Sequence, residues 1–261
     1  MVNGLGGIFL KTSDPKLLAR WYEDHLGIGF GTSTFFTFNW KDLKSGALCH
    51  TDLSLFPSNT NYFYPSDHEV MINLRVENLD TIRIRLKNDR QEVIDKIEVH
   101  EYGRFGWVVD PEGNKIELWE PPVQQLSEFG SESKLGGEVT GLGGIFIKCS
   151  NPTVLSQWYS KYLGLFFDHA AHQFLWNEPG TEKPSSTVLS FFPEGSNYFS
   201  PSEKRFMLCL RVKNLDSLLR TLAQAEIEII GQPQVYEYGK FGWFIDPDGN
   251  KVELWEPTEA N

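Results

Sequence analysis

The stretch EYGRFGWVVDPEGNKIELWEP, from Glu101 to Pro121, returns as EYGKFGWFIDPDGNKVELWEP, from Glu237 to Pro257, with 16 of 21 positions identical. An earlier stretch is repeated as well. The sequence LGGIFLKTSDPKLLARWYEDHLG, which starts at Leu5, matches LGGIFIKCSNPTVLSQWYSKYLG, which starts at Leu142. A repeat of this length predicts two domains that share one fold.

The chain has 261 residues, which suits two domains because a single domain usually spans roughly 100–200 residues. We place the first domain at residues 1–121 and the second at residues 141–261. Residues 122–140 are rich in Gly, Ser and Glu and show little hydrophobic periodicity, so they are predicted to form a linker.

Charge and apolar content limit the partners of the chain. The formal net charge is −11, which argues against nucleic acid because binding to a phosphate backbone relies on Lys and Arg. No apolar run reaches the length of a membrane span or of the hydrophobic part of a signal peptide. We therefore expect a cytoplasmic protein with neither nucleic acid nor a membrane as partner.

The cysteines do not follow the repeat. The positions equivalent to Cys49, Cys149 and Cys209 in the other copy hold Ser185, Thr12 and Asn73. A disulfide or a thiolate metal site that recurs in both copies is therefore not expected.

Each copy opens with the pattern of a strand followed by a helix. In the first copy an apolar strand is expected at Gly6–Lys11, and Asp14 and Pro15 then supply a helix cap and the first helical residue. Apolar residues recur at helical spacing up to Gly27, which suits a left-handed helix end.

The same pattern restarts within each copy after two alternating, aromatic strand segments. Met71–Val76 has the composition of a strand, and a helix is expected over residues 78–88. The last two strands are joined by residues 110–114, where a proline and a glycine suit a tight hairpin turn. Each copy therefore contains a strand, a helix and further strands, twice over.

With this order of elements, and with the closing signature DP(E/D)GNK(I/V)ELWE in both copies, the chain resembles the vicinal oxygen chelate superfamily. That superfamily includes glyoxalase I, bleomycin-resistance proteins and extradiol dioxygenases. The resemblance implies an α+β fold with two tandem glyoxalase-like domains, each made of paired βαβββ modules that form cupped mixed sheets. It also implies an internal pseudo-dimer, compatible with a monomeric chain. Because this fold supports many activities, function has to be argued from the site.

In relatives that hold a metal, four ligands lie along the cavity, and the resemblance places their positions in this chain. The closing glutamate is present in both copies, as Glu117 and Glu253. The other positions fall near Gly7 and Gly144, near Met71 and Met207, and near Asp52 and Val188. A divalent ion needs three or four N, O or S ligands, so a divalent metal has weak support and the cofactor stays unknown.

One strand in the first copy carries polar residues that the second copy lacks. His50, Asp52 and Ser54 alternate and therefore share one face of the strand. In related two-copy proteins, a cavity can combine the first module of one copy with the second module of the other. We therefore predict a composite pocket, and a candidate metal site, of His50, Asp52 and Glu253 near Met207. The alternative is a solvent-exposed strand edge.

Further side chains are candidates for substrate binding. Arg75 and Arg211 share a strand face with Met71 and Met207, where they could bind a carboxylate or phosphate or form a salt bridge to a glutamate. Other candidates are the aromatic residues close to the closing glutamates and to the last hairpin, Trp119, Trp255, Tyr102 and Tyr238. The tryptophans could stack on a flat substrate or belong to the core.

The closing glutamates are also candidate catalytic residues. A carboxylate in an apolar cup has its pKa raised by desolvation, so Glu117 and Glu253 could act as general bases without a metal, or could pair with Arg or Lys. Two functions follow for a small-molecule ligand. The first is a glyoxalase-like enzyme of the lyase, isomerase or oxygenase type, and the second is a binding protein that sequesters a small aromatic or cationic compound.

Overall fold

The computed structural model describes residues 2–122, 139–180 and 183–258. The predicted linker, residues 122–140, therefore lies almost wholly outside the described residues, and the domain limits on either side of it stay predictions. No helix in the described part of the chain combines the length and the apolar character needed to cross a membrane.

The first copy contains seven strands and two helices. They are β1 (Val2–Thr12), α1 (Pro15–Leu26), β2 (Phe35–Asp42), β3 (Leu48–Pro57), β4 (Val70–Val76), α2 (Leu79–Asn88), β5 (Val93–His100), β6 (Gly103–Val109) and β7 (Lys115–Glu120).

The second copy repeats this order and adds one turn of 3₁₀ helix. Its elements are β8 (Val139–Cys149), α3 (Pro152–Leu163), β9 (Ala171–Asn177), β10 (Pro184–Pro193), η1 (Asn197–Phe199), β11 (Phe206–Val212), α4 (Leu215–Gln224), β12 (Ile229–Tyr236), β13 (Gly239–Ile245) and β14 (Lys251–Pro257).

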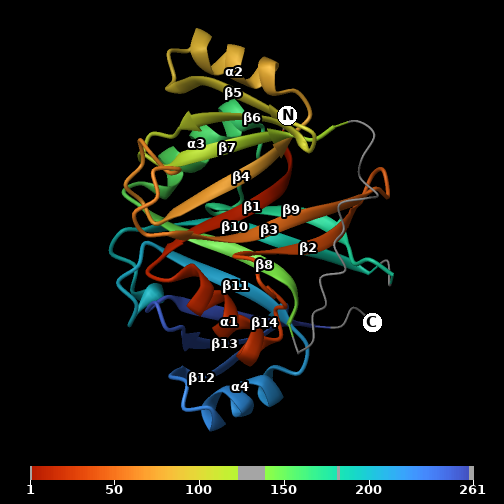
Figure 1. Cartoon of the computed structure of the whole chain (residues 1–261), viewed down its shortest axis with the longest axis vertical. Helices are drawn as coiled ribbons and strands as arrows, with labels where there is room; N and C mark the ends of the chain where they lie inside the picture. The colour runs from red at the N-terminus through yellow and green to blue at the C-terminus, as the bar shows by residue number, and fades with distance from the viewer. Residues whose placement is uncertain (1, 123–138, 181–182, 259–261) are drawn as a thin grey trace.

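The strands of the described residues form one sheet of 14, in the order β12-β13-β14-β11-β8-β10-β9-β2-β3-β1-β4-β7-β6-β5. The two copies meet at its centre, where β2 and β9 pair through Lys41 with Asn177 and Asp42 with Trp176. Helices α2 and α4 lie at the two far ends of the molecule (Figure 1). The sheet mixes parallel pairs, such as β1 with β3, and antiparallel pairs, such as β1 with β4. The predicted α+β fold with cupped mixed sheets is thus confirmed.

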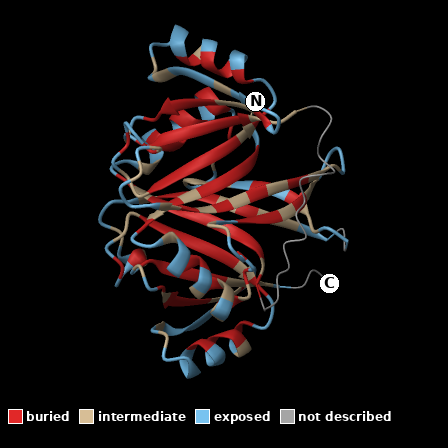
Figure 2. Ribbon diagram, in the orientation of Figure 1, coloured by how far each residue is buried: buried red, intermediate tan, exposed pale blue. Residues whose placement is uncertain are grey.

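The first module of each copy differs from the predicted βαβββ order. Only two strands follow α1 before β4 among the described residues, whereas three strands follow α2. The segment after α1 packs Ile28 and Phe30 into the core and forms no additional strand of the sheet before β2. Figure 2 shows that the buried residues lie mainly in the inner strands of the sheet, whereas the end strands β5 and β12 and the outer faces of the helices are exposed.

The ends of α1 follow the local sequence. The Asp14 side chain accepts hydrogen bonds from the backbone N–H groups of Lys16 and Leu17, and Gly27 ends the helix at φ 68°. The cap satisfies N–H groups that have no partner within the helix, and the glycine takes a left-handed conformation that other residues avoid. Helix α3 repeats both features with Asn151 and Gly164.

The first helix of each copy is bound to the last hairpin of the other copy. The hydroxyl of Tyr22 on α1 donates to Asp246 Oδ2 at 2.8 Å, and that of Tyr159 on α3 donates to Asp110 Oδ2 at 3.0 Å. All four side chains are buried. These reciprocal contacts give the two copies the relation of a pseudo-dimer.

Four strands of the first copy bring one residue each into a single row. Asp52 on β3 is opposite Gly7 on β1, Gly7 is opposite Asn73 on β4, and Asn73 is opposite Glu117 on β7. The matching row of the second copy holds Val188, Gly144, Cys209 and Glu253. These rows cross the two cups and bring residues of both modules together.

Candidate functional site

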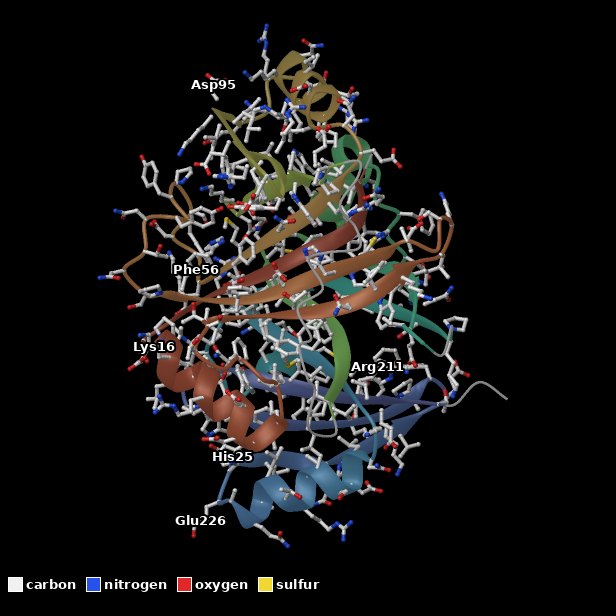
Figure 3. The ribbon with its side chains drawn as sticks, turned by 45° about the vertical axis from the view of Figure 1, so that its right-hand side comes forward. Lys16, His25, Phe56, Asp95, Arg211 and Glu226 are labelled. Carbon is white, nitrogen blue, oxygen red and sulfur yellow. The ribbon has the colours of Figure 1, made fainter. Side chains whose placement is uncertain are left out.

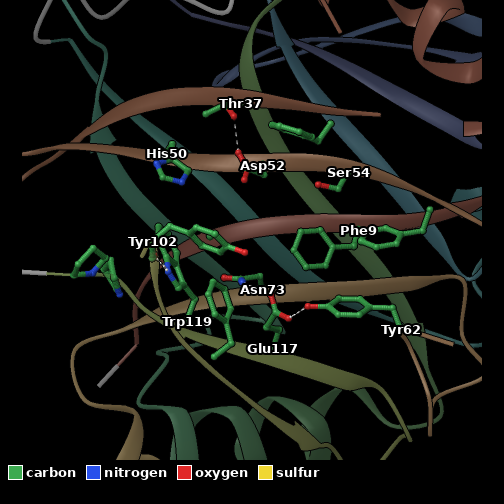
Figure 4. Close-up of a pocket in the computed structure, with 16 residues that line it drawn as sticks. Phe9, Thr37, His50, Asp52, Ser54, Tyr62, Asn73, Tyr102, Glu117 and Trp119 are labelled. Carbon is green, nitrogen blue, oxygen red and sulfur yellow. Dashed lines mark hydrogen bonds between the residues drawn. The ribbon is translucent and has the colours of Figure 1, made fainter. Parts of the chain in front are cut away.

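A cavity of about 450 Å³ lies in the cup of the first copy (Figure 4). Its walls are mainly aromatic and come from both modules. The aromatic lining residues are Phe9, Phe35, Phe56, Tyr62, Tyr102, Phe105 and Trp119. The hydrogen-bonding side chains are Thr37, His50, Asp52, Ser54, Asn73 and Glu117. An apolar cavity with a few convergent polar groups is the usual form of a small-molecule site.

Glu117 is buried at one side of this cavity and accepts three hydrogen bonds. Asn73 Nδ2 donates to its Oε1 at 2.7 Å, Trp107 Nε1 donates to its Oε2 at 2.8 Å, and the Tyr62 hydroxyl also donates to Oε2. Burial raises the pKa of Glu117, while these hydrogen bonds and the charge of Lys115 act in the opposite direction. A carboxylate held by three donors in this way stabilises the cup.

His50 and Asp52 lie across the cavity from Glu117, on β3. Figure 4 shows them, with Ser54, directed toward Asn73 and Glu117. The Thr37 hydroxyl donates to Asp52 Oδ1 at 2.7 Å, and the His50 ring lies 5.1 Å from the Trp119 ring, centroid to centroid. The predicted common face of this strand therefore points into a cavity.

The two side chains have opposite pKa shifts. Burial raises the pKa of Asp52, against the effects of His50 and of the hydrogen bond from Thr37. Burial lowers the pKa of His50, against the attraction of Asp52. The shifts bring a carboxyl and an imidazole in one cavity closer in acidity, a property often found at functional sites.

The predicted composite pocket is not the arrangement found, because His50 and Asp52 line a cavity with Glu117 of their own copy. Glu253 lies in the second copy, bound by Tyr198 and Trp243. The reason is the pairing of β1 with β4, which joins the two modules of one copy into a continuous sheet.

The position expected near Met71 is also shifted along the strand. Met71 is opposite Phe9, whereas Asn73 is opposite Gly7 and therefore shares the row with Glu117. In the second copy the corresponding residue is Cys209, opposite Gly144, and Met207 is opposite Phe146. The methionines are fully buried, and the asparagine and the cysteine take the places next to the glutamates.

A protein-family model described as the Glyoxalase/Bleomycin resistance protein/Dioxygenase superfamily matches residues 145–254, within the second copy. The matched second copy belongs to this superfamily. The first copy shares its motifs, its strand order and its glutamate cluster, so the superfamily fold occurs twice. A search of curated proteins gave no match.

Solved structures with this fold include enzymes of two kinds. A catechol 2,3-dioxygenase is 20% identical, with a TM-score of 0.57 over 100% of this chain and 90% of its own. The 2,2',3-trihydroxybiphenyl 1,2-dioxygenase of Sphingomonas wittichii strain RW1 is 15% identical, with a TM-score of 0.60 over 98% and 91%. The Mn(II)-bound glyoxalase of Novosphingobium aromaticivorans is 14% identical, with a TM-score of 0.56 over 98% and 82%. Identities this low establish the shared fold and leave the activity open.

The superfamily includes metal-binding members, but the donors in this chain do not fit a divalent ion. The oxygens of Glu117 are already bound to three donors, and a Cβ at Gly6 would lie 2.2 Å from Asn73 Oδ1, so β1 offers no side-chain ligand there. No group of three or more His, Cys, Asp or Glu side chains in the described ranges is arranged to hold a metal ion. We therefore assign no step to a metal.

The predicted substrate-binding aromatics lie at two different cavities of the superfamily fold. Trp119 and Tyr102 line the cavity of the first copy, and Trp119 Nε1 donates to the Tyr102 carbonyl at 2.9 Å. Trp255 and Tyr238 line a separate cavity in the second copy, with the matching bond at 3.1 Å.

The two predicted arginines differ in position relative to these cavities. Arg211 lines the cavity of the second copy and forms an ion pair with Glu178, while its Nη1 donates to Thr140 at 3.0 Å. A salt bridge was one of the two expected roles, although its partner is Glu178 and not Glu253. Arg75 is not among the described residues that line the 450 Å³ cavity, which include neither arginine nor lysine.

The sequence reasoning did not single out Tyr62, Thr37 and Asn73, although all three bind the acidic side chains of the cavity. Tyr62 had a visible signal, because it belongs to a segment repeated in both copies, Asn61-Tyr62-Phe63 and Asn197-Tyr198-Phe199. Thr37 and Asn73 had no such signal, because the second copy has other residues at their positions.

Proposed function

We propose that the first copy binds a small, flat organic molecule that donates hydrogen bonds, and that binding in this cavity is the function of the protein. One observation carries the proposal: the cavity combines aromatic walls with acceptor groups that the protein leaves available. Asn73 Oδ1 is buried and has no hydrogen-bond partner among the described residues. An unpaired buried acceptor is costly, and a ligand with an amino or hydroxyl group would remove that cost.

Charge narrows the chemical class of this ligand. The described lining includes the carboxyl groups of Asp52 and Glu117 and no lysine or arginine. Aromatic faces attract cations, and a carboxylate attracts an ammonium group, so both kinds of lining group favour a positively charged ligand. An aromatic amine or a hydroxylated ring therefore suits the cavity better than an aromatic acid does.

Ligand titration of the full chain tests this function. Benzylamine, phenol and benzoate serve as probes, with binding followed by calorimetry and by protein NMR. We expect benzylamine or phenol to bind, and Asp52→Val, which installs the second copy's residue, to weaken that binding by roughly tenfold, the equivalent of about 1.4 kcal/mol. The matched control is Val188→Asp in the other cup. If Asp52→Val leaves the affinity unchanged and Val188→Asp alters it, the ligand binds in the second copy and the proposal is contradicted.

A second candidate function is acid–base catalysis in the same cavity, by a glyoxalase-like enzyme of the lyase, isomerase or oxygenase type. The observation that favours it is the pair of opposite pKa shifts of His50 and Asp52. Incubation of each bound probe, followed by mass spectrometry of the solution, separates binding from turnover. Turnover that His50→Gln abolishes while binding persists would establish catalysis.

Two further properties belong to this proposal. The three cysteines are free and buried, which suits a reducing compartment such as the cytoplasm. Tyr22 and Tyr159 each bind the other repeat of the same chain, so these contacts are complete within one molecule and need no second molecule.

A further inference from the structure

The second copy has a cavity of about 680 Å³ with a different lining, formed where β8, β11 and β14 meet the β9–β10 hairpin. Arg211, labelled in Figure 3, lies beside the start of β8. The other basic residues that line this cavity are Lys183 and Lys213, and its acidic residues are Glu178 and Glu256. The described lining therefore contains one more basic side chain than acidic.

Groups of the protein itself bind both carboxylates. Glu178 forms an ion pair with Arg211. Glu256 accepts hydrogen bonds from the backbone N–H groups of Asn214 and Leu215 at the start of α4, at 3.1 and 3.2 Å. The Arg211–Glu178 pair is neutral as a unit, and Lys183 and Lys213 together outweigh Glu256, so the net charge of the described lining is positive.

Two buried donors in this cavity lack an acceptor. Arg211 Nε and Ser185 Oγ are buried and have no hydrogen-bond partner within the described ranges. In the first copy, Arg75 Nε is also unpaired, but the position equivalent to Ser185 is Cys49, so that copy lacks the hydroxyl donor. Buried donors are normally satisfied, so an acceptor group from a ligand would complete this part of the cavity.

An apolar surface lies beside these donors. Trp255 and Tyr238 line the cavity, and their rings belong to an aromatic group in which Phe241 stacks on Trp255 at 6.4 Å between centroids. Leu175, also in the lining, is 58% exposed. A ring that covered these side chains would remove apolar surface from water.

The repeat shows that the positive charge is particular to the second copy. Lys213 matches Glu77 of the first copy. Lys183 matches Ala47, and the two positions are structurally equivalent, since their carbonyls close the same hairpin by accepting from Glu178 N and Asp42 N. The two copies have therefore diverged from each other in charge at the same place.

We propose that this cavity is a second binding site, for a small organic anion with a flat apolar ring. The anionic group binds near Arg211, Lys213 and Ser185, and the ring covers Trp255 and Leu175. This site is separate from the one proposed in the first copy, and its ligand has the opposite charge.

Calorimetric titration of the full chain with benzoate, benzamide and benzylamine tests this site. Benzoate should bind, its uncharged isostere benzamide should bind at least about fivefold more weakly, and added salt should weaken benzoate binding. Lys213→Glu, which installs the residue of the first copy, should weaken benzoate binding roughly fivefold to tenfold. Lys183→Ala should have a smaller effect in the same direction.

Two control variants locate the site. Lys16→Glu changes the net charge by the same amount on the exposed surface of α1 and should leave benzoate binding unchanged. Asp52→Val alters the first cavity and should also leave it unchanged, so failure of the first site does not affect this result. The proposal is overturned if benzoate shows no saturable binding at millimolar concentration, if benzamide binds equally well, or if Lys16→Glu has the effect of Lys213→Glu.

Discussion

The two cups of this molecule have the same frame and different polar linings. In the first, Phe56 stacks on Tyr62 at 5.3 Å with ring planes 3° apart, and in the second, Phe192 stacks on Tyr198 at 5.4 Å with planes 4° apart. The residues that differ line the inner face or touch the glutamate: Thr37 and Gln173, His50 and Ser186, Asp52 and Val188, Asn73 and Cys209. Retained aromatic contacts with altered polar groups show that the copies diverged on the inner faces of the cups, while the frame stayed constant.

The glutamates illustrate the constant part. In both copies, a buried glutamate accepts from a tyrosine hydroxyl and a tryptophan N–H, and a lysine lies over the same two rings. Lys115 is 5.0 Å from the Tyr62 and Trp107 ring centroids. Its charge and the donor groups compensate for burial of the carboxylate, which would otherwise be expensive. Recurrence of this cluster in both cups indicates a structural role that is independent of ligand.

The largest expected effect comes from removal of these glutamates. Glu117→Leu leaves Tyr62, Asn73 and Trp107 without an acceptor, and each buried unsatisfied donor costs about 1–3 kcal/mol, so a loss of about 3 kcal/mol or more is expected in urea unfolding. Glu253→Leu should cost less, because one of its three donors is the Cys209 thiol, which forms weak hydrogen bonds.

The exposed Glu101→Leu serves as the control and should change stability little. Equal losses for the two buried variants would show that the third donor is irrelevant. No loss in either variant would contradict a structural role and would leave the glutamates available for chemistry.

A smaller loss of stability, equal for the two variants, is expected when either tyrosine hydroxyl that binds the other copy is removed. Tyr22→Phe and Tyr159→Phe each remove a buried hydrogen bond to a carboxyl, which contributes about 1.5–3 kcal/mol. The remaining partners of Asp246 and Asp110 are the same, from Asn250 and Asn114. Thermal unfolding should therefore give similar losses, and a large difference between the two would mean that the contact between copies is asymmetric.

The polar lining should add a pH dependence that only the first cup has. The folded pKa of His50 is lowered, so its contribution to stability is present above its unfolded pKa of about 6.5 and is lost as the pH falls through the folded value. Asp52 has a raised folded pKa, so its contribution is lost as the pH rises above about 3.9.

Melting temperatures from pH 5 to pH 8 would check the His50 part of this dependence. Wild type should lose stability relative to His50→Ser as the pH falls below about 6.5. Ser186→Ala, at the matching position without a titrating group, should follow wild type at every pH. A constant difference between wild type and His50→Ser would contradict the lowered pKa.

The fold could be predicted from the sequence because its signals are local and occur twice. Asp14, Pro15 and Gly27 set the limits of α1 through their own backbone preferences, and the closing hairpin carries its turn residues within five positions. The alternation of His50 and Asp52 also predicted a common face correctly, since strand geometry fixes which residues share a side.

The partners of these residues could not be predicted in the same way. Whether Asp52 faces Glu117 or Glu253 depends on which modules pair, and either choice satisfies the same local patterns. The choice of Met71 over Asn73 failed for a related reason, since a register shift in β1 between Leu5 and Gly7 decides which residue reaches the row. Long-range pairing and bulges leave little trace in a single sequence.

The smallest expected effect concerns the tyrosines at the open ends of the two cups. Tyr102 and Tyr238 are 44% and 56% exposed, and the tryptophans bind their backbone carbonyls, so the hydroxyls carry no part of that bond. Tyr102→Phe and Tyr238→Phe should each change stability by less than about 0.5 kcal/mol. Ligand titration then tests each cup by itself, because loss of a hydroxyl that contacts a ligand should lower the affinity only for the ligand of the same cup. Weaker benzylamine binding in Tyr102→Phe alone, and weaker benzoate binding in Tyr238→Phe alone, would show two independent sites on one duplicated frame.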